Sequence, residues 1–456
     1  MHTMKSRLIL SLVLGLGLFS ACKKEDVQTP DQPSTSGTTS YNLKDTTVSY
    51  SKDIYLWYKQ IPSSFNGNSY SDPDAIMTAI RQYSIEPGFS GPVDRWSFAE
   101  KKAVWDGVSS GIAGDFGMDV FFRTEGDLRV KYVEKESPAG KAGVRRGWRI
   151  TKINGSTNIA TSNANFIVDA VWNSTNSSFT FQKPDGNTVD LSFTAAQYRE
   201  QPVYLDTVYN INNNPVGYMV FNSFMGDTTR TYNEFSRIFN RFTAANVNDV
   251  VIDLRYNGGG YVSVAEKLAN YLVSSSANGG LMMKQEFNDK YPQYNSVTNF
   301  QKIGSLNARR LFFIVSNSTA SASELLINNL KPYMDVKLVG PKSTYGKPVG
   351  FFPIPVGDWY IFPVSFRTTN RNGEGNYFNG IPVNNTVADG LDKDWGDVTE
   401  SSLASVLSYV GTGAFRTQEQ STQSTELQRY SAQTNAGNEV LDRHFFKGAV
   451  DPRRHK

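Results

Sequence analysis

Short apolar runs alternate with segments of helical periodicity between residues 201 and 410. Apolar runs of this length, separated by amphipathic helices, predict an α/β fold with buried strands. The predicted strands are Pro215–Phe221, Asp249–Leu254 and Leu311–Val315. The predicted helices are Tyr232–Ala244, Val264–Val273 and an apolar helix that runs through Leu330. We therefore expect an α/β core over residues 201–410.

The pattern upstream, over residues 108–200, is typical of a β-rich unit. Phe116–Phe121 and Arg129–Val133 are strand-like, and Asn154-Gly155 is a strong hairpin turn. Whether this β-rich unit binds a partner or only packs internally stays open at this point.

Residues 41–107 indicate a small helical domain with a supporting role. Ile54, Trp57, Tyr58 and Ile61 recur at helical spacing. Asp72 is placed to cap a helix that has Pro73 at its first position. At the other end, residues 411–456 are rich in Gln, Ser and Thr and predict a loose polar tail.

The amino terminus predicts export and lipid attachment. Lys5 and Arg7 precede an apolar run over residues 8–21, which is short for a membrane span and right for a signal peptide. The run ends at Cys22, the single cysteine of the chain, and resembles the lipobox of bacterial lipoproteins. We expect a signal peptide at 1–21, a lipid on Cys22, a flexible tether at 22–40 and a location in the cell envelope, at the outer membrane or periplasmic face. Ordinary secretion with a chance cysteine is the alternative.

Composition narrows the chemistry. The formal charge of the 456 residues is only +3, which argues against nucleic acid as a partner. The three histidines are His2, His444 and His455, all near the chain ends. A Ser–His–Asp triad or a histidine zinc site inside the core is therefore improbable, and a hydrolase of this sequence needs another base, for which lysine is the known substitute.

Three local features of the core are candidates for chemistry, although each has a plain structural explanation. Ser321 and Glu324 have the spacing of a capping box at a helix start. Lys347 lies in a turn between glycine and proline, where a surface lysine is common. The glycines at 258–260 suit any tight turn.

Taken together and in order, these features resemble the carboxyl-terminal processing peptidases, also called tail-specific proteases, over about residues 41–410. The markers are Asp253–Gly260, Thr319–Glu324 and Tyr345–Lys347, with Gly380–Pro382 near the end of the core. The resemblance implies a crotonase-like or ClpP-like α/β core and no metal or organic cofactor. It implies Ser321 as nucleophile, Lys347 as general base and Glu324 as orienting acid, with the amides of Gly260 and Ala322 as oxyanion hole.

Residues 136–155 resemble a PDZ domain through the Ser-Pro-Ala-x-x-Ala-Gly helix start, the Gly-x-x-Ile strand and the Ile-Asn-Gly turn. PDZ domains bind extended peptide ends by strand addition. By this resemblance, an inserted PDZ domain at 108–200 would hold a carboxylate-binding loop around Phe116, Gly117 and Met118.

One position departs from the family pattern. Many members carry a glutamine four residues after the lysine, where this chain has Phe351, so another group has to orient Lys347. We expect a lipid-anchored serine endopeptidase that acts on polypeptides. Two alternatives remain, namely an inactive peptide-binding scaffold and a hydrolase acting on a non-peptide acyl compound.

Overall fold

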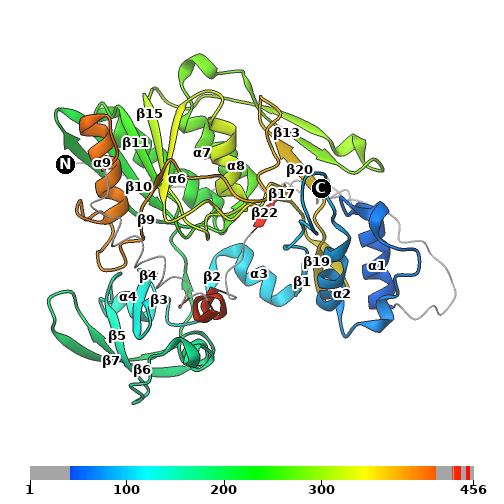
Figure 1. Cartoon of the computed structure of the whole chain (residues 1–456), viewed down its shortest axis with the longest axis horizontal. Helices are drawn as coiled ribbons and strands as arrows, with labels where there is room; N and C mark the ends of the chain where they lie inside the picture. The colour runs from blue at the N-terminus through cyan, green and yellow to red at the C-terminus, as the bar shows by residue number, and fades with distance from the viewer. Residues whose placement is uncertain (1–41, 417–433, 435, 443–447, 452–456) are drawn as a thin grey trace, which may run out of the picture. The chain divides into compact units, whose positions relative to one another are not determined.

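The computed structural model describes residues 42–416, 434, 436–442 and 448–451 (Figure 1). Its central sheet has six strands in the order β21-β16-β15-β11-β10-β9. All neighbouring pairs are parallel except β9 with β10. The strands are β9 (Val203–Ile211), β10 (Asn214–Phe221), β11 (Asp249–Asp253), β15 (Arg310–Ile314), β16 (Asp335–Gly340) and β21 (Asn385–Thr386).

Helices cover both faces of this sheet because successive side chains of its strands point to opposite sides. Val250 and Ile252 of β11 pack in one core with α6 (Thr228–Ala244), α7 (Val262–Leu272) and α8 (Ala322–Leu330). Val251 packs in a second core with α9 (Ser401–Thr412). The prediction of an α/β core is confirmed.

A separate antiparallel sheet follows the order β3-β4-β5-β6-β7 and has its own core. Its strands are β3 (Met118–Thr124), β4 (Asp127–Val133), β5 (Arg149–Ile153), β6 (Asn176–Gln182) and β7 (Thr188–Thr194). Ser137 caps the short helix α4 (Pro138–Lys141), and Asn154 and Gly155, both at positive φ, form the tight turn that the sequence predicts. The helix α5 (Ala164–Val168) completes this unit.

The amino-terminal segment contains α1 (Leu43–Ile54), α2 (Pro73–Ile80) and α3 (Lys102–Ser110). Asp72 caps α2 and Pro73 opens it, as predicted. The segment is not helical throughout, because β1 (Phe98–Lys101) pairs with β19 (Trp359–Phe362), which continues to β18 (Ile354–Val356). Its apolar side chains therefore share one core with residues from 349 to 378.

Two smaller sheets border the core. One has the order β14-β13-β20-β17, with β13 (Leu281–Phe287), β14 (Ser296–Asn299), β17 (Val349–Gly350) and β20 (Phe366–Thr369). The other joins β2 (Ile112–Ala113) to β8 (Tyr198–Arg199).

The described part of the carboxyl-terminal segment differs from the loose tail that its composition predicts. Residues 436–441 are helical, and β22 (Gly448–Val450) pairs in parallel with β12 (Gly259–Tyr261). Leu441 and Val450 are buried in two different cores, which supplies the apolar contacts that a mainly polar segment needs to dock.

Candidate active site

Ser321 occupies a strained turn between β15 and the start of α8. Its backbone angles are φ 59° and ψ −106°, in a region that only glycine adopts readily. The side chain is 1% exposed, and its hydroxyl has no hydrogen-bond partner in the part of the chain that the structure describes. The turn thus places the hydroxyl beside the first amides of α8.

The Glu324 carboxylate connects Ser321 to the turn that carries Lys347. Its Oε2 accepts hydrogen bonds from the main-chain N–H groups of Ser321 at 2.7 Å and Lys347 at 2.8 Å. Its Oε1 accepts from the Thr344 hydroxyl at 2.6 Å and the Gly346 amide at 2.6 Å. Burial raises the pKa of Glu324, and these four donated hydrogen bonds oppose the rise. Glu324 therefore fixes the backbones of Ser321 and Lys347.

The amine of Lys347 lies in an aromatic enclosure. Lys347 is 1% exposed, and its Nζ is 3.6 Å from the ring centre of Phe351 and 5.9 Å from that of Trp96. Burial lowers the pKa of Lys347 well below its usual value, while the negative charges of Asp94 and Glu324 oppose this effect. Burial thus favours the neutral amine, the form that can accept a proton.

Trp96 and Asp94 are the part of this site that the sequence did not predict. They belong to the amino-terminal segment, to which we assigned only support. Asp94 is held by Tyr55, whose hydroxyl donates to it at 2.8 Å, and by the main chain of Trp96 at 2.8 Å. The signal in the sequence was a tryptophan preceded by two charged residues, a pattern that on its own is common at surfaces.

The glycine-rich turn reaches the same helix start. The Asn257 side chain accepts from the Gly259 amide at 2.9 Å and donates to the Phe221 carbonyl at 2.9 Å. A Cβ on Gly259 would stand 3.0 Å from the Ala322 nitrogen, so the turn lies directly against the first amide of α8. Gly260 has φ 136° and passes so close to Phe224 that a Cβ would lie 2.4 Å from its carbonyl carbon. Both positions require glycine.

The charged residues of the Asp253–Gly260 motif form a buried network of ion pairs. Arg255 forms buried ion pairs with Asp253 at 2.7 Å, Asp389 at 2.8 Å and Glu400 at 2.9 Å. Arg146, from the five-stranded unit, also pairs with Asp389 at 2.7 Å. This network attaches the end of β11 to α9 and to the five-stranded unit.

The residues expected to bind a peptide carboxylate lie apart from Ser321. Phe116 is buried in the core of the five-stranded unit, and the Gly117 amide already donates to the Asp115 carboxylate at 2.7 Å. A cleft of about 430 Å³ has Gly117, Met118, Gly258 and Gly259 among its lining residues. The cleft connects the predicted peptide loop with the glycine-rich turn.

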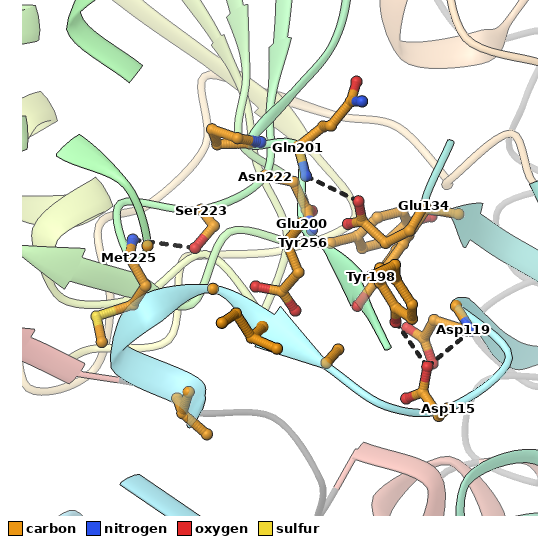
Figure 2. A pocket seen from close by; sticks show the side chains of 18 of the residues that line it. Asp115, Asp119, Glu134, Tyr198, Glu200, Gln201, Asn222, Ser223, Met225 and Tyr256 are labelled. Atoms are coloured by element: carbon orange, nitrogen blue, oxygen red, sulfur yellow. Dashed lines mark hydrogen bonds between the residues drawn. The ribbon is translucent and has the colours of Figure 1, made fainter. Parts of the chain in front are cut away.

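Carboxylates gather in this cleft, as Figure 2 shows for Asp115, Glu134 and Glu200. Burial, together with the charge of Glu200, raises the pKa of Glu134 to about 8, although Gln201 and Tyr204 donate to it. Burial also raises the pKa of Glu200 to about 7, with Asp115 contributing. The charge of the cleft therefore changes near neutral pH.

Cys22 and the signal peptide and tether predicted around it lie outside the described residues. Within the described ranges, no helix combines the length and the apolar character that crossing a membrane requires.

Residues 215–387, which include Asn257, Gly260, Ser321, Glu324 and Lys347, match the family model of Peptidase family S41. This segment is thus similar to the S41 peptidases.

Named relatives give the same picture. The chain is 27% identical over 259 residues to the "Carboxy-terminal processing protease CtpB" of Bacillus subtilis, which covers 56% of this chain and 50% of the relative. It is 26% identical over 243 residues to a "Probable CtpA-like serine protease" of Staphylococcus aureus, covering 53% of this chain and 46% of the relative. The matches thus span about half the length of these relatives.

A solved structure shares the fold. The crystal structure of a candidate S41 protease from Bacteroides fragilis aligns with a TM-score of 0.64 over 80% of this chain and 96% of that chain, at 23% identity. At this identity the likeness supports the fold alone.

Proposed function

We propose that the chain is a serine-type endopeptidase in which Ser321 is the nucleophile and Lys347 the general base. The observation that carries the proposal is the Glu324 carboxylate, which holds the main chain of both residues through one oxygen, at 2.7 and 2.8 Å. The strained Ser321 turn and the buried lysine amine add to it. A hydroxyl is a weak nucleophile until a neighbouring base removes its proton, and a neutral lysine can do so.

The proposed reaction forms and then hydrolyses an acyl-enzyme. The Lys347 amine takes the proton of Ser321 as Oγ bonds to the peptide carbonyl carbon, and the carbonyl oxygen becomes an oxyanion. The amides of Gly260 and Ala322 would stabilise that oxyanion. The lysine ammonium then returns the proton to the departing amine as the C–N bond breaks. Water repeats the sequence at the ester, which releases the acid and restores Ser321.

We also propose the parts of the assignment that concern substrate and location. The core would be crotonase-like or ClpP-like, and residues 108–200 would be an inserted PDZ domain that presents polypeptide ends to it. The cleft between Met118 and Gly259 supports this route, and the names of the relatives suggest carboxyl-terminal segments as substrates. A lipid on Cys22 would anchor the protein in the cell envelope. Fatty-acid labelling of the wild type but not of Cys22→Ala is the expected result, and equal labelling would contradict the anchor.

The nucleophile is tested by a pair of neighbouring serines. Ser321→Ala should abolish cleavage of an unfolded protein and preserve the fold. Ser323 is the matched control, because its hydroxyl only donates to the Asn257 carbonyl at 3.0 Å, and Ser323→Ala should keep most activity. Activity that survives Ser321→Ala would exclude Ser321 as the nucleophile.

The base is tested by pH. The wild-type rate should rise with pH as Lys347 loses its proton, then level off. Lys347→Arg should be nearly inactive, because a guanidinium stays protonated. Substantial activity of the arginine variant would rule out a neutral lysine as base.

A further inference from the structure

The described part of the carboxyl-terminal segment docks in two places, one on the five-stranded unit and one beside the candidate active site. Neither contact follows from the polar composition of the segment. Both contacts use the edges of strands, where an extended peptide can add to a sheet.

The first contact is on β3, the edge strand of the five-stranded sheet. Asn438 accepts a hydrogen bond from the Phe122 amide at 2.9 Å and donates one to the Phe122 carbonyl at 3.0 Å. A side-chain amide thus supplies the pair of hydrogen bonds that an added strand would make at this residue. Leu441 is fully buried in the core of the same unit, and Asp442 forms an ion pair with Lys131 at 3.3 Å.

The second contact is a strand inserted between two parts of the candidate active site. On one side β22 pairs with β12, so that Gly448 lies opposite Gly259 and Val450 opposite Tyr261. On the other side Val450 pairs with Phe351, and the Asp451 amide donates to the Phe351 carbonyl at 3.2 Å. The segment therefore separates the glycine-rich turn from the residue that faces the Lys347 amine.

A carbonyl of this strand lies next to the proposed oxyanion hole. The Gly448 carbonyl oxygen is 2.7 Å from the point where a Cβ on Gly259 would stand, and the Ala322 nitrogen is 3.0 Å from that same point. The tail thus brings a peptide carbonyl to the start of α8, where the carbonyl of a substrate is expected.

We propose that the described parts of the carboxyl-terminal segment, residues 436–442 and 448–451, are intramolecular ligands of the peptide-binding edges β3 and β12, and that a polypeptide substrate binds β12 only after β22 leaves. The inference rests on the proposed function, since it takes β12 as part of the substrate site. A tethered ligand competes at a high effective concentration, so a substrate in solution has to overcome it. Its apparent affinity falls by the fraction of molecules in which the site is open.

Two substitutions in the full-length chain should release the segment, one at each contact. Leu441→Asp removes the apolar anchor on the five-stranded unit, and Val450→Asp removes the anchor beside Phe351. Glu439→Ala is the matched control, because Glu439 is exposed on the same helical turn. We expect kcat/KM for an unfolded protein to rise about tenfold or more in both release variants and to stay unchanged in the control. An unchanged or lower kcat/KM in variants whose circular dichroism shows a native fold would overturn the proposal.

A binding measurement decides the point without catalysis. A fluorescent peptide of residues 434–451 should bind Ser321→Ala/Val450→Asp at least about tenfold more tightly than Ser321→Ala alone, because only the double variant has an open site. Equal affinities would overturn the proposal. If every variant lacks peptidase activity, the proposed function fails while this measurement still tests the tail. The two release positions lie in different cores, so a folding defect in one variant leaves the other to decide.

Discussion

Replacing Glu324 by glutamine exchanges one carboxylate oxygen for an NH₂ group at the point where four donors converge. Each oxygen accepts two hydrogen bonds at 2.6–2.8 Å, so whichever oxygen is exchanged, the new amide faces two former donors. The best arrangement keeps oxygen toward Ser321 and Lys347 and turns the NH₂ toward Thr344 and Gly346. The threonine hydroxyl can turn to accept, but the Gly346 amide cannot, so at least one N–H loses its acceptor.

The expected cost follows from the charge of the acceptor. A hydrogen bond to a charged group contributes about 1.5–3 kcal/mol. Disturbing the two bonds at one oxygen should therefore lower the free energy of unfolding by about 3–6 kcal/mol, less whatever the removal of a buried charge returns. Displacement of the Lys347 turn should also reduce kcat by on the order of 100-fold, since catalysis is sensitive to shifts of about 1 Å.

Stability is measured by denaturant unfolding of the double variant Ser321→Ala/Glu324→Gln, in which the serine substitution prevents self-cleavage. The value of kcat is measured on Glu324→Gln alone, which retains Ser321. Glu374→Gln is the control, because Glu374 is exposed and accepts only from Asn370, at 2.8 Å, in the contacts described. It should change stability by less than about 0.5 kcal/mol. If Glu324→Gln changes the free energy of unfolding by less than about 0.5 kcal/mol and retains the wild-type kcat, the carboxylate does not hold the site together.

Three further substitutions test separate parts of the site. Lys347→Met should abolish activity but stabilise the fold at pH 7, because burial lowers the pKa of Lys347 and the unfolded chain therefore binds a proton more readily than the folded chain. The free energy of unfolding of the wild type should rise with pH, so the advantage of methionine should shrink near pH 10. Lys342→Met, at an exposed position, is the control in the same unfolding series and should not show this pH-dependent difference from the wild type. Gly260→Ala should cost at least about 3 kcal/mol and most activity, because alanine at φ 136° is strained and its Cβ would overlap backbone, whereas Gly91→Ala, with open space around it, should be neutral in thermal unfolding. Asp389→Asn should lower the free energy of unfolding by about 2 kcal/mol at neutral pH, because two arginines hold the pKa of Asp389 at about 2 although burial raises it. The contribution of the carboxylate to stability should be present above about pH 4 and lost as the pH falls toward 2. An acid titration of stability that is identical in wild type and variant would contradict this.

The features that could be predicted from the sequence are those with a local cause. The run at 249–254, with Val250, Val251 and Ile252 between two aspartates, is predicted to be a buried strand, and it forms β11. Asp72 and Pro73 begin a helix because a side-chain acceptor and a fixed φ act over one turn. The spacing of Ser321 and Glu324 predicts a contact for the same local reason, since the Glu324 carboxylate accepts a hydrogen bond from the Ser321 amide within one turn of α8.

The features that could not be predicted depend on contacts between distant parts of the chain. Trp96 reaches the Lys347 amine only because β1 joins the sheet of β18 and β19, and no periodicity in either segment reports that pairing. The contacts of the tail are also distant: Leu441 and Val450 lie in the short apolar pairs Val440-Leu441 and Ala449-Val450 of a mainly polar segment, so the pattern shows no continuous face to bury. Leu441 and Val450 each pack in a core that is formed mainly by other segments.

The Phe351 ring, in the position where related peptidases often carry a glutamine, changes how Lys347 can be controlled. A cation 3.6 Å from an aromatic ring centre gains on the order of 2 kcal/mol when it is desolvated, which favours the protonated amine. Removing an ammonium group from water costs several kcal/mol, and burial lowers the pKa of Lys347 well below its usual value, so burial opposes the effect of the ring. In the proposed mechanism, the ring would nevertheless lower the energy of the ammonium that forms once the Ser321 proton has moved. A hydrogen-bonding side chain at this position would orient the amine but would also bring a polar group into the pocket. If Lys347 is the general base as proposed, Phe351 would favour the neutral amine by excluding water and would still stabilise its conjugate acid, which suits a group that has to take up a proton and then return it.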